Sequence, residues 1–400
     1  MRLSITGAVL LAVGVFAVLT GLLPLADVTA LVARVVPILL FVVSMTVVTE
    51  LASAAGIFRW VARRFRSWGR GRAVLLWLLV AAFATVCTIF FSLDTTAVLL
   101  TPVVVTVARQ AGLPALPFAL TTVWLANTAS LLLPISNLTN LLAEHEMSGT
   151  SPARFAALMW APALAAVAVP VLFIGIVFRS ALRKRYDRIP VTRIRSAESA
   201  DAGTLPLPAT DRTLLGTCAA VLVILLPALV SGVAVWIPST AAAVVLAAVF
   251  AVRRRQCLKF SLIPWPLLLF ASGLFLVMET FRHLGAPVVL GQLTGPGHGA
   301  VDLLRLAATG AVGANVLNNL PAYLLAEPVA GTPQRLAALL IGVNAGALIT
   351  PWASLATLLW HDRLMRMNVL ITWKGYALFG LVVAPLTVVA AVAALALVQV

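Results

Sequence analysis

Hydroxyl and amide side chains interrupt strongly apolar sequence at four places, and these residue types can bind an ion or a small polar molecule. The first half contains "FFSLDTTAVLLTP" and "ANTASLLLPISNLTNLL", and the second contains "GANVLNNLPAYLL" and "VNAGALITPWASLATLLW". Asp94 is the only carboxylate among the candidates, so it is the expected proton or cation ligand. The candidate binding residues are Asp94, Thr95, Thr96, Asn127, Thr128, Ser130, Ser136, Asn137, Asn315, Asn318, Asn319, Asn344, Thr350, Ser354 and Thr357.

The composition around these residues is that of a membrane protein. The 400 residues are 62% hydrophobic and 10% charged, with a mean hydropathy of +1.07, whereas charged residues make up about 25% of soluble domains. Apolar runs of about 20 residues, enough to cross a bilayer, recur along the chain; Ser4–Leu23 and Val35–Phe58 are examples. We read the first run as a membrane helix and not as a cleaved signal peptide. The sequence predicts an all-α polytopic membrane protein.

The net charge of +15 is distributed in a way that orients the chain and argues against a nucleic-acid partner. Placing the basic loops in the cytoplasm leaves only five of the 28 Lys and Arg residues outside, as the positive-inside rule requires. We therefore expect a multi-pass protein of the inner (plasma) membrane, with a cytoplasmic N-terminus and an external C-terminus. Membrane lipid is the expected partner of the basic loops. The residues that remain outside are Arg34, Arg154, Arg282, Arg305 and Arg335.

The two halves of the chain repeat one another. A shift of 217 residues aligns Asn127 with Asn344 and Pro134 with Pro351, and upstream markers align Glu50 with Glu279. A glutamate at membrane depth is expensive, so its recurrence is informative. We predict a first membrane repeat at 1–178, a basic cytoplasmic linker at 179–213, and a second repeat at 214–400 with an extra leading helix.

The charge assignment makes the repeats inverted in topology. Each repeat then holds a re-entrant helical hairpin, at about 73–109 and 301–330, and a discontinuous helix, at about 117–143 and 335–360. Inverted repeats with broken helices mark the central site of secondary transporters, because irregular backbone at membrane depth must be buried in protein or line a wet cavity. Helix N-termini there favour anions, and freed carbonyls favour cations. We assign structural or gating roles to Glu50, Glu279, Pro134 and Pro351.

Enzymatic and metal chemistry have little support in the sequence. The three cysteines have no metal-ligand spacing, and the four histidines fall in or beside expected loops. Neither H-E-x-x-H nor G-x-S-x-G occurs. We therefore expect no enzyme, no metal site and no cofactor, apart from a coupling H⁺ or Na⁺.

Five motifs in order, spanning nearly the whole chain, resemble the arsenite efflux permeases of bacteria. They belong to a wider ion-transporter group that includes divalent anion–sodium symporters and sodium–proton antiporters. The resemblance implies outward transport of arsenite or antimonite driven by the proton gradient, sometimes with a cytoplasmic ATPase partner, and a homodimer. The motifs are "RSWGRGRAVLLWLLVAAFATV", "DTTAVLLTPVVV", "LANTASLLLPISNLTNLL", "NVLNNLPAYLL" and "ITPWASLATLLW".

The chain departs from that family pattern at charged positions. The pattern has Asp where this chain has Asn127 and Asn344, and Lys where it has Leu348. An asparagine cannot cycle a proton, so proton coupling transfers poorly. The alternatives are therefore a sodium- or proton-coupled transporter of another anion, such as a carboxylate, and an anion channel or uniporter. The substrate on these hypotheses is a small inorganic or organic anion, or a neutral oxyacid.

Overall fold

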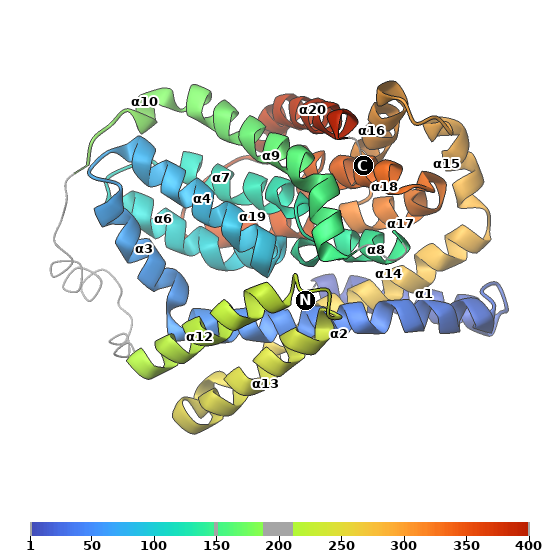
Figure 1. Ribbon diagram of the computed structural model, residues 1–400, viewed down its shortest axis with the longest axis horizontal. Helices are drawn as coiled ribbons and strands as arrows, with labels where there is room; N and C mark the ends of the chain where they lie inside the picture. The colour runs from blue at the N-terminus through green and yellow to red at the C-terminus, as the bar shows by residue number, and fades with distance from the viewer. Residues whose placement is uncertain (1, 148–150, 187–210, 399–400) are drawn as a thin grey trace.

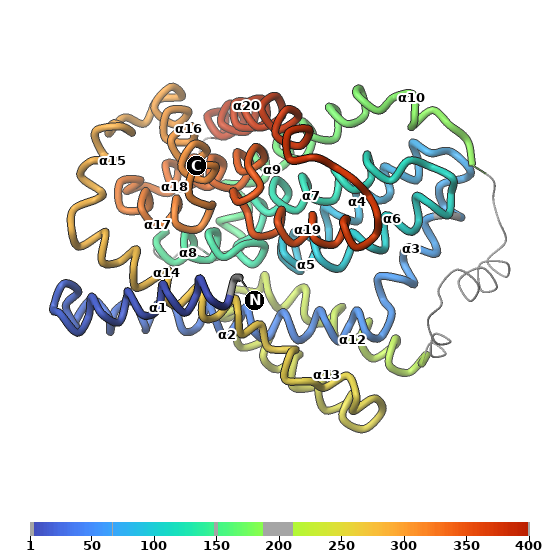
Figure 2. Tube along the Cα trace, turned by 180° about the vertical axis from the view of Figure 1, so that it is seen from behind, coloured from blue at the N-terminus to red at the C-terminus, as the bar shows by residue number. Residues whose placement is uncertain are grey.

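The helices are arranged in two layers, as the computed structural model shows in Figures 1 and 2. The structure describes residues 2–147, 151–186 and 211–398, so most of the predicted linker lies outside the described residues. We call the lower layer of Figure 1 the scaffold layer. Its helices are α1 (Arg2–Leu19), α2 (Leu25–Ala55), α12 (Arg212–Ala228), α13 (Trp236–Arg253) and α14 (Trp265–His283).

The upper layer, which we call the bundle layer, contains two pairs of helices joined by tight turns and two helices interrupted by 3₁₀ or π turns. α3 (Ile57–Trp68) and α15 (Ala286–Thr294) join the scaffold layer to it. Its helices are α4 (Ala73–Phe91), α5 (Leu93–Thr95), α6 (Thr101–Gln110), α7 (Ala115–Thr128), α8 (Leu138–Glu146), α9 (Pro152–Val177), α10 (Arg179–Leu182), α16 (Ala300–Val316), α17 (Asn319–Ala330), α18 (Pro333–Leu340), α19 (Leu355–Arg366) and α20 (Trp373–Leu397).

The same order of elements occurs in both halves. Gly56 directly follows α2 and Gly285 lies two residues after α14. Both glycines have left-handed backbones, with φ of 94° and 88°. A paired set of helices follows in each half and turns at Ser92 or at Asn318. Next comes a helix interrupted by short 3₁₀ or π turns, α7–α8 or α18–α19, and last a long helix, α9 or α20. Gly suits the left-handed turns because it has no Cβ.

The helix that precedes α2 and the helix that precedes α14 exchange partners. α1 packs along α14, and α13 packs along α2. The first contact is very close, because a Cβ built on Gly273 would lie 2.4 Å from the backbone nitrogen of Leu11, and one on Gly7 would lie 2.6 Å from that of Phe270. Small residues allow such close approach between membrane helices. The scaffold layer therefore needs helices from both halves.

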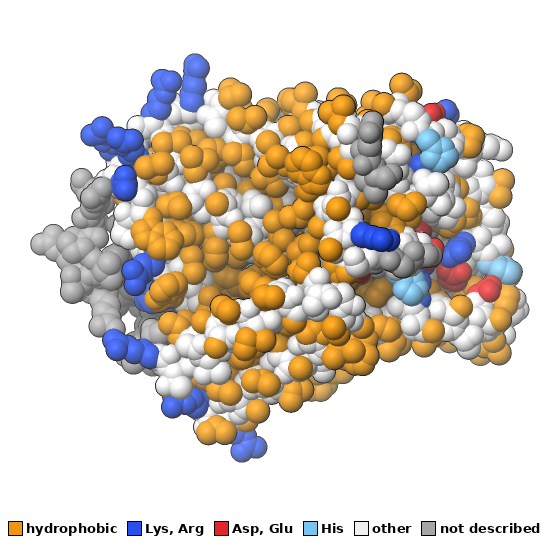
Figure 3. All heavy atoms as spheres, in the orientation of Figure 1, with side chains coloured by type: hydrophobic (Ala, Val, Ile, Leu, Met, Phe, Trp, Pro, Cys, Tyr) orange, Lys and Arg blue, Asp and Glu red, His pale blue; other side chains and the backbone are white. Residues whose placement is uncertain are grey.

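The structure confirms an all-helical protein with apolar spans. Within the described residues, six helices are long and apolar enough to cross a membrane: α2, α4, α9, α13, α14 and α20. α2 begins at Leu25, well before the apolar run that starts at Val35. The charged residues Asp27 and Arg34 interrupt the apolar sequence there but do not interrupt the helix. Lys and Arg side chains gather at the end of the molecule near α3 and α10 (Figure 3). We call this the basic end.

Candidate functional site

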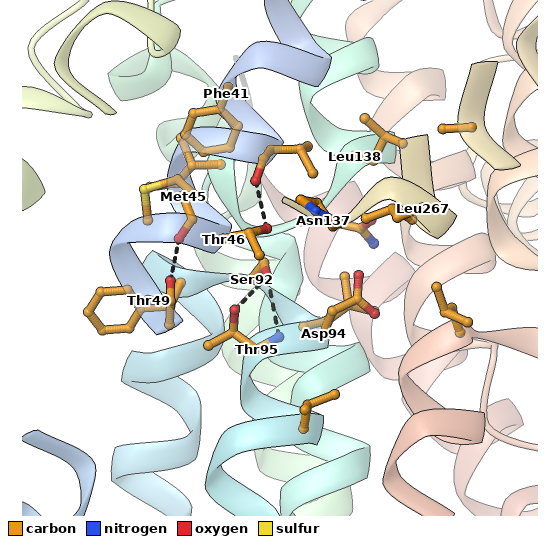
Figure 4. Close-up of a pocket in the computed structure, with 18 of the residues that line it drawn as sticks. Phe41, Met45, Thr46, Thr49, Ser92, Asp94, Thr95, Asn137, Leu138 and Leu267 are labelled. Carbon is orange, nitrogen blue, oxygen red and sulfur yellow. Dashed lines mark hydrogen bonds between the residues drawn. The ribbon is translucent and has the colours of Figure 1, made fainter. Parts of the chain in front are cut away.

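A cavity of about 300 Å³ lies between the two layers, where the first hairpin turns (Figure 4). α2 contributes Thr46, Thr49 and Glu50 from the scaffold side. The turn after α4 contributes Ser92, Asp94 and Thr95, and the start of α8 contributes Asn137 and Leu138. The first turn of α14 and the start of α19 complete the lining with apolar side chains, among them Leu267 and Leu355.

The Asp94 carboxylate is presented by a backbone turn that most residues avoid. Ser92 has a φ of 86°, so α4 stops there, and its hydroxyl oxygen accepts a hydrogen bond from the Thr95 nitrogen at 3.5 Å. Asp94 follows within the first turn of the returning segment. One of its carboxylate oxygens is buried without a hydrogen-bond partner in the described protein. Because buried polar atoms normally have partners, this oxygen is available to a proton, a cation or a hydroxyl group.

The charge of the lining restricts what the cavity can hold. Glu50 and Asp94 line it, and among the described lining residues there is no Lys, Arg or His. The hydroxyls of Thr46 and Thr49 donate to carbonyls of their own helix, at 2.7 and 2.6 Å, which leaves their oxygens free to accept. Two carboxylates without a cation favour a neutral or positively charged guest in such a low-dielectric place.

The two broken helices are fastened together beside the cavity through Asn344. Its side-chain oxygen accepts from Asn137 Nδ2 at 2.8 Å and from Thr139 Oγ1 at 3.1 Å. Its nitrogen donates to Asn140 Oδ1 at 3.0 Å, and Asn140 donates to the carbonyls freed at the first break, including that of Ser130 at 2.6 Å. Through these three hydrogen bonds the Asn344 amide holds the two breaks in register.

The candidates around the second turn brace backbone and do not line the cavity. Asn315 Oδ1 accepts from the nitrogens of Ile349 and Thr350, at 3.1 and 3.0 Å, and Thr350 donates to the Asn315 carbonyl at 2.8 Å. Asn318 donates to the Trp352 carbonyl at 2.8 Å, and Asn319 is buried at the first position of α17. The two halves thus use their polar breaks differently.

The other candidates lie around the first hairpin and the start of α19. Thr96 donates back to the Ser92 carbonyl at 3.1 Å, and Ser136 donates to the Ile89 carbonyl at 2.7 Å. Ser130 donates to the Asn127 carbonyl at 2.6 Å. Among these remaining candidates, the buried side-chain oxygens without a hydrogen-bond partner in the described residues are Asn127 Oδ1, Thr128 Oγ1, Ser354 Oγ and Thr357 Oγ1.

The residues assigned to structure or gating have different surroundings. Pro134 and Pro351 each begin a short 3₁₀ turn at a helix break, where the missing N–H removes no helical hydrogen bond. Glu50 lines the central cavity, whereas Glu279 lies away from it, 3.8 Å from Arg282 on the next turn of α14.

Several residues of the site were not among the candidates. Thr46 and Thr49 line the cavity from α2, and Ser92 makes the turn. Arg34 and Glu327 form a buried ion pair between the layers. Hydroxyl residues in an apolar helix usually pack against their own backbone, so only a fold that places α2 against the first hairpin reveals Thr46 and Thr49. In the described residues, no group of three or more His, Cys, Asp or Glu side chains could hold a metal ion.

Comparison with known proteins supplies the family. A model described as citrate transporter, CitMHS, matches residues 2–337. The chain belongs to the CitMHS citrate transporter family. The arsenical pump membrane protein of Escherichia coli is 28% identical over 384 residues, which cover 89% of this chain and 85% of that protein. The putative arsenical pump membrane protein of Bacillus subtilis is 24% identical over 403 residues, covering 92% and 89%.

A solved structure shares the fold of this CitMHS family member. The YdaH transporter of Alcanivorax borkumensis, whose crystal structure is described as having an unusual topology, matches with a TM-score of 0.58 over 92% of this chain and 87% of that one. At 16% identity the likeness shows the fold alone. The family and its relatives confirm the resemblance seen in the motifs. The protein is a multi-pass membrane transporter of ions.

Proposed function

We propose that this CitMHS family protein is a secondary transporter that exports arsenite or antimonite in exchange for protons. The observation that carries this proposal is the charge of the central cavity, which is lined by Glu50 and Asp94 and by no described cationic side chain. Arsenite is an uncharged trihydroxy acid at neutral pH, so its hydroxyl groups can pair with Asp94 and Asn137 without charge repulsion. The arsenical pump proteins among the relatives support the same substrate.

Citrate fits this cavity poorly, although the family model carries its name. Citrate brings three carboxylates, and the two carboxylates of the lining would repel them across a few ångströms of apolar surroundings. Transport of another anion, coupled to sodium or protons, therefore requires a cation in the cavity as a companion ion. An unpartnered oxygen of Asp94 is available to such a cation.

A uniporter or channel is the second candidate, and the amides at the two breaks favour it. The Asn344 oxygen accepts two hydrogen bonds and its nitrogen donates one, and neither Asn344 nor Asn127 can carry a proton. In that case flux would follow the gradient of the substrate alone. Substitution of Asp94, the carboxylate at the hairpin turn, distinguishes the two mechanisms, because only proton-coupled transport requires this group.

The membrane arrangement belongs to the same proposal. The repeated order of elements supports two repeats. The distribution of Lys and Arg supports opposite orientations for them, with the hairpins α4–α6 and α16–α17 entering the membrane from opposite sides. The basic end would then face the cytoplasm, with the N-terminus inside and the C-terminus outside. A homodimer and a cytoplasmic ATPase bound to the basic end complete the proposal.

The test is uptake of arsenite into inside-out vesicles under an imposed proton gradient. We expect accumulation driven by the gradient with the native chain and its loss with Asp94→Asn. Asp362→Asn, an exposed carboxylate on α19, is the control and should transport normally. Arsenite flux that ignores the proton gradient would support the uniporter. Absence of arsenite flux under any gradient, from folded protein, would overturn the proposal, and citrate would be tested next.

A further inference from the structure

Three cavities lie one after another along α2, and together they trace a route from the Arg34 end of the molecule to the basic end. The central cavity shares Glu50 with a cavity of about 530 Å³ toward the basic end, which is also lined by Ala54 and Lys259. It shares Leu141 with a cavity of about 450 Å³ toward the other end, lined by Arg34 and Ile38. Because α2 lines all three, the positions 33–54 of one helix follow the route from end to end.

An ion pair between the layers closes the end of this route that lies away from the basic end. Arg34 of α2 donates to both carboxylate oxygens of Glu327 on α17, with the longer bond at 3.1 Å. Tyr323 donates to the same carboxylate at 2.8 Å, and Glu146 at the end of α8 lies 3.2 Å from Arg34. The side chains of Arg34 and Glu327 are only 12% and 5% exposed. Removal of one partner from such a buried pair is strongly destabilising, because the other charge is left buried and unpaired.

Arg34 also contacts the segment that separates the central cavity from the Arg34 cavity. Arg34 also donates to the Leu142 carbonyl at 3.4 Å, next to Leu141. Leu141 is buried and lines both the central and the Arg34 cavity. Separating Arg34 from Glu327 and α8 would therefore release the segment that keeps these two cavities apart.

A second pair of opposite charges, Glu50 and Arg363, lies toward the basic end, and these two side chains do not form an ion pair in this structure. Glu50 of α2 stands where the central and basic-end cavities meet. Leu355 and Leu359 of α19 line the central cavity, and Arg363 continues the same face of that helix one turn on. Within the described residues, no ion pair of Glu50 lies inside 4 Å. Glu50 and Arg363 belong to different layers, as do Arg34 and Glu327.

We propose that Arg34–Glu327 and Glu50–Arg363 are alternating ion-pair gates at the two ends of the route. In this structure the first pair is closed and the second is open, so the central cavity communicates with the basic end. A relative movement of the layers breaks the first pair and forms the second, which exposes the cavity to the other side. This inference rests on the proposed transport route and is independent of the substrate.

The test measures from which side a cysteine in the central cavity can be labelled. Thr46→Cys is the reporter, in a Cys257→Ser background, because Cys87 and Cys218 are buried and Cys257 is partly exposed. A membrane-impermeant thiol reagent is added to right-side-out or to inside-out vesicles. With the native gates we expect labelling from the basic side only. The double variant Arg34→Gln/Glu327→Gln removes both charges together, and we expect labelling from the other side to rise about tenfold.

Two further variants keep the outcome interpretable. Glu50→Gln should leave labelling from the basic side intact. Added to the Arg34→Gln/Glu327→Gln double variant, it should lower labelling from the other side, because the second pair cannot form. Asp362→Asn/Arg366→Gln removes an exposed ion pair within α19 and should change nothing. If size-exclusion chromatography shows that the Arg34/Glu327 double variant is folded and its labelling is unchanged, the proposed Arg34–Glu327 gate is wrong. Loss of arsenite flux with the labelling pattern intact would contradict the substrate and leave the gates standing.

Discussion

Asn137 donates a hydrogen bond of 2.8 Å to the side-chain oxygen of Asn344, across 207 residues of sequence. The bond joins the break in the first half of the chain to the break in the second. On its other side the Asn344 nitrogen donates to Asn140 at 3.0 Å. One amide therefore accepts and donates at once, which an ionised carboxylate cannot do.

Asn344→Asp should destabilise the protein at neutral pH and do so less at acidic pH. The ionised carboxylate would face the Asn140 oxygen without a proton between them, at a cost of about 1–3 kcal/mol for the unsatisfied buried groups. The protonated acid could donate to that oxygen as the amide does. Thermal unfolding in detergent at two pH values, relative to the native chain at the same pH, measures the difference. Asn368→Asp, at an exposed turn, is the control, and equal shifts at both pH values would contradict the network.

Leu141→Ala should create a leak between the central and the Arg34 cavities. The leucine lines both, so its truncation removes side-chain volume from the boundary between them. We expect passive flux of a small neutral solute into vesicles to rise several-fold. Leu142→Ala is the matched control, because Leu142 is buried and does not line the central cavity. That variant should lose about 2–5 kcal/mol of stability without a leak, and a leak in both would argue against a boundary at Leu141.

Gly273→Leu should prevent α14 from packing on α1. A Cβ at this position meets the backbone of α1 at 2.4 Å, so the helices must separate. We expect a marked fall in the unfolding temperature and in the amount of folded protein. Gly216→Ala on α12 is the control, because a Cβ there meets nothing within 4 Å and alanine favours a helix by about 1 kcal/mol over glycine. A tolerated Gly273→Leu would show that the close contact between α1 and α14 is not required for folding.

The start of α12 should loosen on acidification. The Leu214 amide, which hydrogen-bonds to Asp211, holds the pKa of this carboxyl below its usual range, and Arg253 at 2.9 Å acts in the same direction. A lowered pKa means that the contribution is present above the ordinary pKa of an aspartate and is lost as the pH falls through the folded value. The protection of the Thr213 and Leu214 amides from hydrogen exchange, corrected for the intrinsic pH dependence of exchange, should therefore fall in that range. Asp211→Asn should abolish the pH dependence, and identical exchange with and without the carboxylate would contradict it.

The helix breaks could be predicted from local sequence, because proline acts on its own neighbours. Pro134 and Pro351 each lie within an apolar stretch and each begins a 3₁₀ turn. The recurrence of Glu50 and Glu279 likewise pointed to corresponding helices, and those helices precede Gly56 and Gly285, which share one backbone conformation. A pattern of this kind depends on residue type and spacing alone.

The lining of the cavity could be predicted only in part, because residue type does not give the direction of a side chain. Asp94, Thr95 and Asn137 do line it, whereas Asn315, a residue of equally suggestive type, is used to brace the second break. The contact of Arg34 with Glu327 joins positions 293 residues apart. No local pattern pairs such residues, so the gate at that end of the route emerged only from the packing of the layers.

The pairing of α1 with α14 has a consequence for biosynthesis. α1 leaves the ribosome long before its partner α14, which begins only at Trp265. At a synthesis rate of about 5–20 residues per second, roughly 10 to 50 s pass before α14 is available to pack against the glycine-containing face of α1. A nascent first half is therefore an incomplete folding unit. Both halves must be synthesised and inserted into the membrane before the scaffold layer can finish packing.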